Sequence, residues 1–141
     1  MAAALLIVLA PAAWASSWQG SYNPAGPGYI TAEGNVTWDS KIQFDHEAWL
    51  GDVCGSGGQG DGFGVATEPI INTPSSVNFN PLWTNTTGCG TLVYRNQLDR
   101  RVGGQNVQNI TYRIYLTDEG DLFQVAITQC MDNHNVGGNQ C

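Results

Sequence analysis

The amino-acid sequence predicts an all-β protein, a small antiparallel β-sandwich or barrel with disulfides. Two stretches, residues 35–45 and 109–117, alternate apolar and polar side chains with the period of two that half-buried strands show. Gly, Asn, Ser and Thr are abundant between such stretches, as turns require, and no stretch shows a convincing helical period. About six short strands at this spacing are typical of a sandwich or a small barrel.

The stretch at residues 35–45 is expected to be one long strand with one polar face. Its apolar row, expected to face the core, consists of Val36, Trp38, Ile42 and Phe44. The following residues, 45–51, are expected to form one short helical turn, because Asp45 can cap its start and Gly51 can end it.

The stretch at residues 109–117 is expected to be a second long strand, with Asn109 on its solvated row. Its apolar row consists of Ile110, Tyr112, Ile114 and Leu116. Residues 117–121 read Thr-Asp-Glu-Gly-Asp, and the alternation resumes over residues 122–129. This pattern predicts a hairpin with Gly120 in the left-handed conformation. Shorter strands are expected at residues 62–67, 76–79 and 91–95.

The first 15 residues are typical of a signal peptide. The apolar run Ala2 to Ala10 is nine residues long, and Ala13-Trp14-Ala15 is a small-x-small cleavage motif. We therefore expect residues 1–15 to be removed. Because no apolar run reaches the roughly 18 residues of a membrane span, no membrane association is expected after processing. Alternatively, the apolar start is retained and buried against a neighbouring subunit, as in a filament.

Residues 16–141 are expected to form a single β-rich domain, since neither an internal repeat nor a change in composition divides them. The domain begins with a Gly/Pro-rich N-terminal segment, residues 16–30. This segment contains too few apolar residues to be expected as a core strand.

Four cysteines and an apparent leader indicate an oxidising compartment, so the protein is expected to be secreted and extracellular. Four thiols allow three pairings. Nearest-neighbour closure favours Cys54 with Cys89 and Cys130 with Cys141. No Cys-x-x-Cys motif is present and there are only two His, so a zinc site is not expected, and we expect no metal at all.

Three Asn-x-Thr sequons, at Asn35, Asn85 and Asn109, predict a glycoprotein if the host organism glycosylates Asn. Asn35 and Asn109 fall on the polar rows of the two alternating stretches, where a glycan would stand in water.

Twelve acidic and five basic residues give a formal charge of −7. Nucleic-acid binding depends mainly on Lys and Arg, so a nucleic-acid partner is not expected.

The Gly-rich run from Gly55 to Gly60 matches the letters of a dinucleotide-binding fingerprint, but that fingerprint needs a βαβ unit that the sequence does not predict. We expect no cofactor.

Candidate catalytic residues are few. His46 and Glu47 form a His-Glu pair, but the second His of a zinc peptidase is replaced by Leu50. His46, Glu47 and His134 remain candidates for general acid-base work only if the fold brings them together. Without a nucleophile motif, an enzyme is less expected than a binding protein.

Residues 113–141 resemble the end of the small fungal guanyl-specific ribonucleases. The shared features are the Arg-Ile-Tyr-Leu stretch from Arg113, the strand at residues 122–128 and the terminal Cys141. Where that family has its catalytic His, directly after Ile-Thr, this sequence has Gln129. The resemblance implies a ribonuclease-like protein that lacks this catalytic group.

Aromatic residues give another functional indication. Trp18, Trp49 and Trp83 lie in segments rich in polar or turn residues, and an exposed ring beside Asn and Asp side chains suits a sugar. We take these three as candidate ligand-binding residues.

Three function classes remain. The first is a secreted extracellular binding or effector-like protein that recognises carbohydrate or a cell-surface partner through a rigid scaffold. The second is a structural subunit of an extracellular filament, formed by self-association at a sheet edge. The third is a small secreted acid-base hydrolase.

Overall fold

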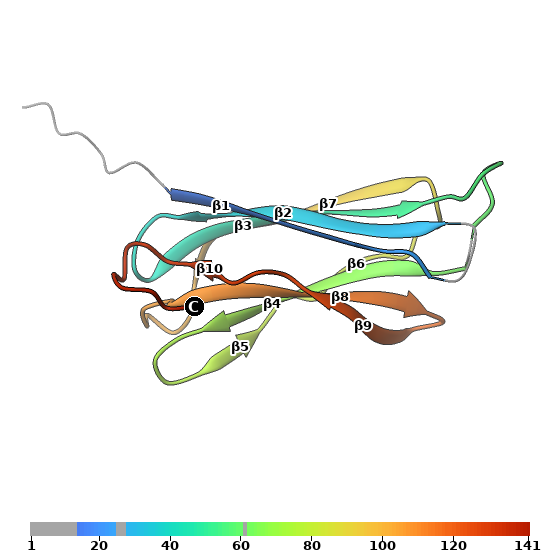
Figure 1. Cartoon of the computed structure of the whole chain (residues 1–141). Coiled ribbons are helices and arrows are strands. Elements are labelled where there is room, and N and C mark those ends of the chain that lie inside the picture. Colours follow the sequence, from blue (N-terminus) through green and yellow to red (C-terminus); the bar gives the residue numbers. More distant parts are fainter. Residues whose placement is uncertain (1–13, 25–27, 61) are drawn as a thin grey trace, which may run out of the picture.

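Alternating apolar and polar side chains build two antiparallel sheets that pack face to face as an open sandwich, not a closed barrel (Figure 1). The computed structural model describes residues 14–24, 28–60 and 62–141. These residues contain no helix, and therefore no helix that could cross a membrane. The all-β prediction is confirmed.

The upper sheet in Figure 1, called sheet A, has four strands in the order β1-β2-β3-β7. Every neighbouring pair is antiparallel. Its strands are β1 (Trp14–Tyr22), β2 (Tyr29–Trp38), β3 (Gln43–Val53) and β7 (Thr91–Arg101).

The lower sheet, called sheet B, is centred on two long strands, β4 and β8. The outer edge of β8 pairs with β9 along one part and with β10 along another, and β4 pairs in the same way with β5 and β6. The strands are β4 (Gly64–Asn72), β5 (Val77–Phe79), β6 (Trp83–Asn85), β8 (Asn109–Asp118), β9 (Asp121–Ile127) and β10 (Met131–Asp132).

The core lies between the sheets and is rich in aromatic rings. Trp18 of β1 stacks on Tyr112 of β8, with ring centroids 4.2 Å apart and an interplanar angle of 15°. Gly34 on β2 permits this, because a Cβ there would lie 2.8 Å from two atoms of the Trp18 ring. Trp38 and Phe44, which are register partners on β2 and β3, are buried, with ring centroids 5.7 Å apart.

The expectation of one strand over residues 35–45 is wrong. β2 ends at Trp38, β3 begins at Gln43, and the amides of Asp39 and Ser40 donate to the Gln43 carbonyl at 3.2 and 3.1 Å. The connection contains four residues, so the period of two continues through it and Trp38 and Phe44 share one face. The alternation is therefore real, but it belongs to two strands joined by a turn.

The helical turn expected at residues 45–51 is also wrong, because these residues belong to β3. The segment alternates as a strand does: His46, Ala48 and Leu50 are buried. Pairing with β2 on one side and β7 on the other supplies its backbone hydrogen bonds. The hydrogen bonds to these two neighbouring strands outweigh the local preference of Asp45 and Gly51 for the ends of a helix.

The N-terminal segment was expected to lack a core strand, yet residues 14–22 form β1. Trp18 is buried in the core, and its inward neighbours on the strand are the small residues Ser16 and Gly20. Because the neighbours of Trp18 on this side of the strand are small, the sequence lacks the apolar alternation that would predict a strand here.

The predicted hairpin and disulfides are confirmed. β8 and β9 are joined by Glu119 and Gly120, both at positive φ (48° and 98°), which is the two-residue turn that suits the twist of a hairpin. Two disulfides close the pairs Cys54–Cys89 and Cys130–Cys141.

Candidate functional site

The outward face of sheet A carries side chains in straight rows, because the strand registers place one outward residue of each strand beside the next. The three central rows run from β1 to β7. They are Gln19, Glu33, Trp49 and Tyr94; Ser17, Asn35, Glu47 and Asn96; and Ser21, Thr31, Gly51 and Leu92. Neighbouring strands lie about 4.8 Å apart, and successive rows on one face are separated by about 7 Å.

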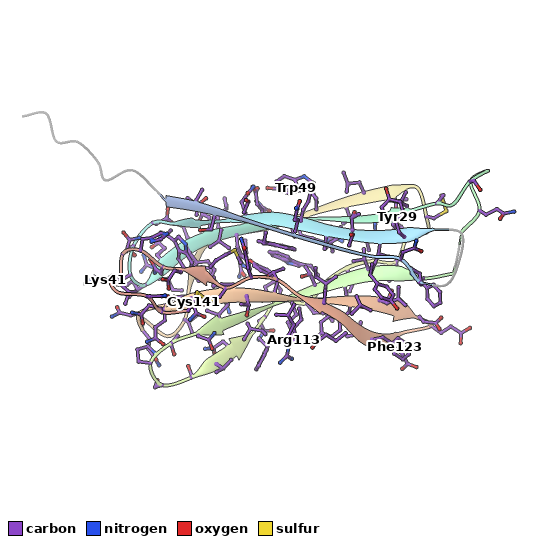
Figure 2. The ribbon with its side chains drawn as sticks, viewed as in Figure 1. Tyr29, Lys41, Trp49, Arg113, Phe123 and Cys141 are labelled. Carbon is purple, nitrogen blue, oxygen red and sulfur yellow. A yellow bond between two sulfur atoms is a disulfide. The ribbon has the colours of Figure 1, made fainter. Side chains whose placement is uncertain are left out.

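An aromatic pair stands at the centre of this face. Trp49 of β3 and Tyr94 of β7 have ring centroids 5.0 Å apart and an interplanar angle of 41°. Trp49 is half-buried and Tyr94 is 45% exposed. Figure 2 shows Trp49 on the side of sheet A that faces away from sheet B. Two adjacent rings are thus offered to solvent on a sheet face, a surface that can take the flat side of a ligand.

Glu47 holds the Tyr94 ring of this pair in place. The Tyr94 hydroxyl donates to Glu47 Oε2 at 2.7 Å, and Asn35 Nδ2 donates to Glu47 Oε1 at 2.8 Å. The hydrogen bond to the Glu47 carboxylate raises the pKa of Tyr94 above its usual value. Both carboxylate oxygens are therefore used within the protein, and the Tyr94 ring is tied to its neighbour across the strands.

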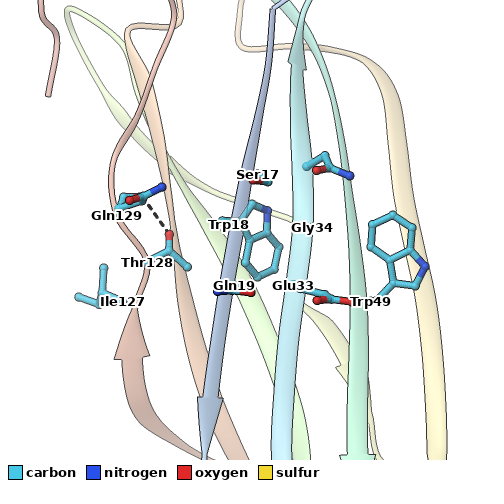
Figure 3. A pocket seen from close by; sticks show the side chains of 10 residues that line it. Ser17, Trp18, Gln19, Glu33, Gly34, Trp49, Ile127, Thr128 and Gln129 are labelled. Carbon is cyan, nitrogen blue, oxygen red and sulfur yellow. Dashed lines mark hydrogen bonds between the residues drawn. The ribbon is translucent and has the colours of Figure 1, made fainter.

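A groove of about 570 Å³ crosses sheet A beside Trp49. Figure 3 shows it from close by, with Trp49 at one end, Ile127, Thr128 and Gln129 at the other, and strands β1 and β2 between them. The groove is lined by Ser17, Trp18, Gln19, Glu33, Gly34, Asn35, Trp49, Ile127, Thr128 and Gln129. Most of these residues offer hydroxyl, amide or carboxylate groups, so the groove is mainly polar, with Trp49 at one end and the apolar side chain of Ile127 at the other.

In the row beside the aromatic pair, Gly51 is buried between the side chains of Thr31 and Leu92. A Cβ at this position would lie 2.4 Å from the Thr31 hydroxyl oxygen, so a larger residue would force Thr31 to move. Leu92, in the same row, and Tyr29, in the next row, are 66% and 43% exposed.

The three tryptophans proposed from the sequence lie in different environments. Trp49 is on the outer face, whereas Trp18 and Trp83 are only 3% and 7% exposed. Trp18 stacks in the core, and the ring of Trp83 lies 4.6 Å from that of His46. The rings of Trp18 and Trp83 are core side chains, so the expectation that they offer a surface to a ligand is wrong.

The three catalytic candidates do not converge. His46 and Glu47 are consecutive on β3 and point to opposite faces, since His46 is buried and Glu47 lies on the outer row. His134 follows β10 and is exposed. No acid-base pair is therefore assembled from these residues.

His46 has a structural environment. Its Nδ1 lies 2.8 Å from the Tyr112 hydroxyl, and its Nε2 lies 3.1 Å from Gln97 Oε1. Because Gln97 Oε1 can only accept, Nε2 carries the proton and the Tyr112 hydroxyl donates to Nδ1. Burial lowers the pKa of His46 to about 4, although the hydrogen bond to Gln97 acts in the opposite direction. A neutral imidazole thus bridges the two sheets.

The three sequons also differ. Asn35 lies on the outer face of sheet A, as expected, but Asn85 and Asn109 are buried. Asn85 Nδ2 donates to the Leu50 carbonyl at 2.9 Å, and Asn109 Nδ2 donates to the Gln140 carbonyl at 2.5 Å. The expectation of a solvated Asn109 is wrong, because the C-terminal segment covers that end of β8. A glycan at Asn85 or Asn109 would replace hydrogen bonds that the fold uses.

Two other features of the described residues have some properties of a site. The carboxylates of Asp39, Asp45 and Asp99 lie within 4.8 Å of one another at one end of sheet A, but they are partly or fully exposed and Asp45 Oδ1 already accepts from the Asp99 amide. Burial, with help from the other two carboxylates, raises the pKa of Asp39. A second hollow, of about 720 Å³, lies near the Cys54–Cys89 disulfide, and Leu82 and Leu122 contribute to its lining. Neither feature combines an exposed aromatic pair with ordered polar groups.

Sequence reasoning found Trp49 but missed Tyr94 and Glu33 as members of the site. Tyr94 lies 47 residues from Glu47, which it contacts, and only the register of β3 with β7 brings them together. The alternation around residues 91–95 predicted a strand but could not indicate its neighbour.

Comparison of the chain with protein-family models, with curated proteins and with solved structures finds no match.

Proposed function

We propose that the protein is an extracellular carbohydrate-binding protein, and that its binding surface is the outer face of sheet A around Trp49 and Tyr94. One observation carries the proposal: the half-buried ring of Trp49 and the exposed ring of Tyr94, with centroids 5.0 Å apart, lie on a sheet face whose neighbouring rows are made mainly of hydroxyl, amide and carboxylate side chains.

This combination suits a sugar because a pyranose has two kinds of surface. Its C–H groups form an apolar side that packs on an aromatic ring, and its hydroxyls around the rim need hydrogen-bond partners. Trp49 and Tyr94 supply the ring surface. Gln19, Glu33 and Asn96 supply polar groups in the same or the neighbouring row.

The rigidity of the face supports the same function. The residues of the rows lie on paired strands, and Glu47 fixes both Tyr94 and Asn35 through hydrogen bonds. Little side-chain freedom has to be lost at these positions when a ligand binds, which favours affinity.

The two disulfides are in keeping with an oxidising environment outside the cell, where polysaccharides and glycan-bearing surfaces are found. They contribute to the stability of a domain of this size in the absence of a large core.

Affinity electrophoresis of the purified, disulfide-intact protein through gels with and without soluble polysaccharides tests the proposal. We expect at least one polysaccharide to retard the protein, and Trp49→Ala to weaken that binding about tenfold or more, as truncation of a central aromatic contact does.

Phe123→Ala is the matched control, because Phe123 is an aromatic residue of β9 on sheet B and is 51% exposed. It should bind as the wild type does. Failure of every polysaccharide to bind, or equal binding by Trp49→Ala and the wild type, would contradict the proposal.

A further inference from the structure

The charged groups at the centre of the proposed face are all acidic. The three rows of four outward residues contain two carboxylates, Glu33 and Glu47, and no Lys, Arg or His. Arg95 follows Tyr94 in the chain and is exposed on the edge strand β7, but it is the register partner of buried Ala48 and so lies on the opposite side of β7 from Tyr94. Its Nη1 donates to the Tyr94 carbonyl.

The two carboxylates are not equivalent. Glu47 accepts from Tyr94 and Asn35 with its two oxygens, as described above. Glu33 is exposed, lines the groove, and makes no hydrogen bond or ion pair with any residue that the structure describes. It is also the direct register partner of Trp49. An uncompensated negative charge therefore stands one strand away from the aromatic platform.

Of the two carboxylates in these rows, only Glu33 is free to accept from a ligand. The Tyr94 hydroxyl proton and one amide proton of Asn35 are already used on Glu47. Glu33 can only accept. A ligand group that donates hydrogen bonds and carries a positive charge would therefore be attracted to Glu33 and to a protein of net charge −7.

From these observations we infer that the face takes a cationic amino sugar, with one sugar ring on Trp49 and its protonated amine at Glu33. The ligand class is a polymer of amino hexoses whose amines are free, such as deacetylated chitin. This inference rests on the proposed carbohydrate-binding function and names its ligand.

The same charges disfavour other polysaccharides. Polymers that carry carboxylates or sulfates would place like charges beside Glu33 without a basic residue to receive them, and such juxtaposition is a common basis of discrimination. Neutral polymers fit the ring surface but leave the charge of Glu33 unused. We expect the order of affinity to be cationic, then neutral, then anionic.

Titration calorimetry with three short β-1,4-linked oligomers, of glucosamine, N-acetylglucosamine and glucose, tests the inference. At about pH 6, where an amine of this type is protonated, the glucosamine oligomer should bind about fivefold more tightly than the other two, as an exposed ion pair allows. At about pH 9, where the amine is neutral, the preference should vanish.

Glu33→Gln isolates the carboxylate. It should abolish the preference at about pH 6 while leaving affinity for the glucose oligomer unchanged. Glu119→Gln, an exposed residue of the turn between β8 and β9, is the matched control and should keep the preference. Trp49→Ala should weaken all three oligomers, which separates binding at the face from general attraction of a cation to an acidic protein.

The outcomes distinguish the two proposals. Equal binding of the three oligomers at about pH 6, or a preference that survives Glu33→Gln, would overturn the amino-sugar inference and leave carbohydrate binding intact. Glucosamine binding that survives Trp49→Ala would also overturn it. Failure of all three oligomers, together with failure of every polysaccharide in the gel assay, would overturn both.

Discussion

Acidification should destabilise the protein through His46. The imidazole is 1% exposed and is neutral, with one ring nitrogen facing the Tyr112 hydroxyl and the other facing Gln97. Burial lowers the pKa of His46 from 6.5 to about 4. Below pH 6.5 the unfolded chain binds a proton at this position while the folded chain does not, so the free energy of unfolding falls as the pH falls.

The size of the effect follows from the difference between the two pKa values. Each unit corresponds to about 1.4 kcal/mol, so the contribution amounts to about 3 kcal/mol once the pH is below 4, and to about 2 kcal/mol between pH 6.5 and pH 5. Above pH 6.5 both states are neutral at this position and His46 adds no pH dependence.

Urea unfolding at several pH values between about 7.5 and 5 measures this loss in the wild type and in His46→Gln, which removes the titrating group. Most carboxylates remain ionised in this range, so the difference between the two proteins reports His46. A proton NMR titration of the folded wild type, following the His46 ring, gives an independent value should the variant unfold. The same pH dependence in both proteins, or a ring that titrates near pH 6.5, would show that His46 is not the source of the loss.

Two further predictions concern stability, and both are measured by urea unfolding. Trp38→Ala should lower the free energy of unfolding by about 3 to 5 kcal/mol, because the ring is 1% exposed and packs on Phe44. Lys41→Ala in the exposed turn should change the free energy of unfolding by less than about 0.5 kcal/mol. Similar effects of the two changes would contradict the placement of Trp38 in the core. Asn85→Ala should cost about 1 to 3 kcal/mol, because it leaves the Leu50 carbonyl without the donor that the fold provides, and a neutral result would mean that water replaces that donor.

The parts of the fold that the sequence predicted are those whose signals are local. The strand at residues 109–117 and the following hairpin were predictable because the alternation and the Glu119–Gly120 turn lie in one continuous segment. The disulfide pairs follow the shortest closures, with separations of 35 and 11 residues.

The errors arose where the deciding information lay elsewhere in the chain. β1 depends on the pairing of Trp18 with Gly34, and the turn at residues 39–42 preserves the alternation, which concealed the end of β2. The candidate site shows the same limit. Trp49 was noticed as an aromatic residue in a polar segment, but Glu33 and Tyr94 became its neighbours only through the registers of β2, β3 and β7.

The proposed binding surface for sugars is the outer face of sheet A. An NMR titration of the isotope-labelled, disulfide-intact protein with an oligomer of whichever polysaccharide retards it in the gel locates the bound sugar. The largest shifts should be those of the Trp49 indole N–H and of the backbone amides of Glu33, Tyr94 and their row neighbours. Shifts concentrated instead around Leu82 and Leu122, at the second hollow near the Cys54–Cys89 disulfide, would show that the sugar binds elsewhere.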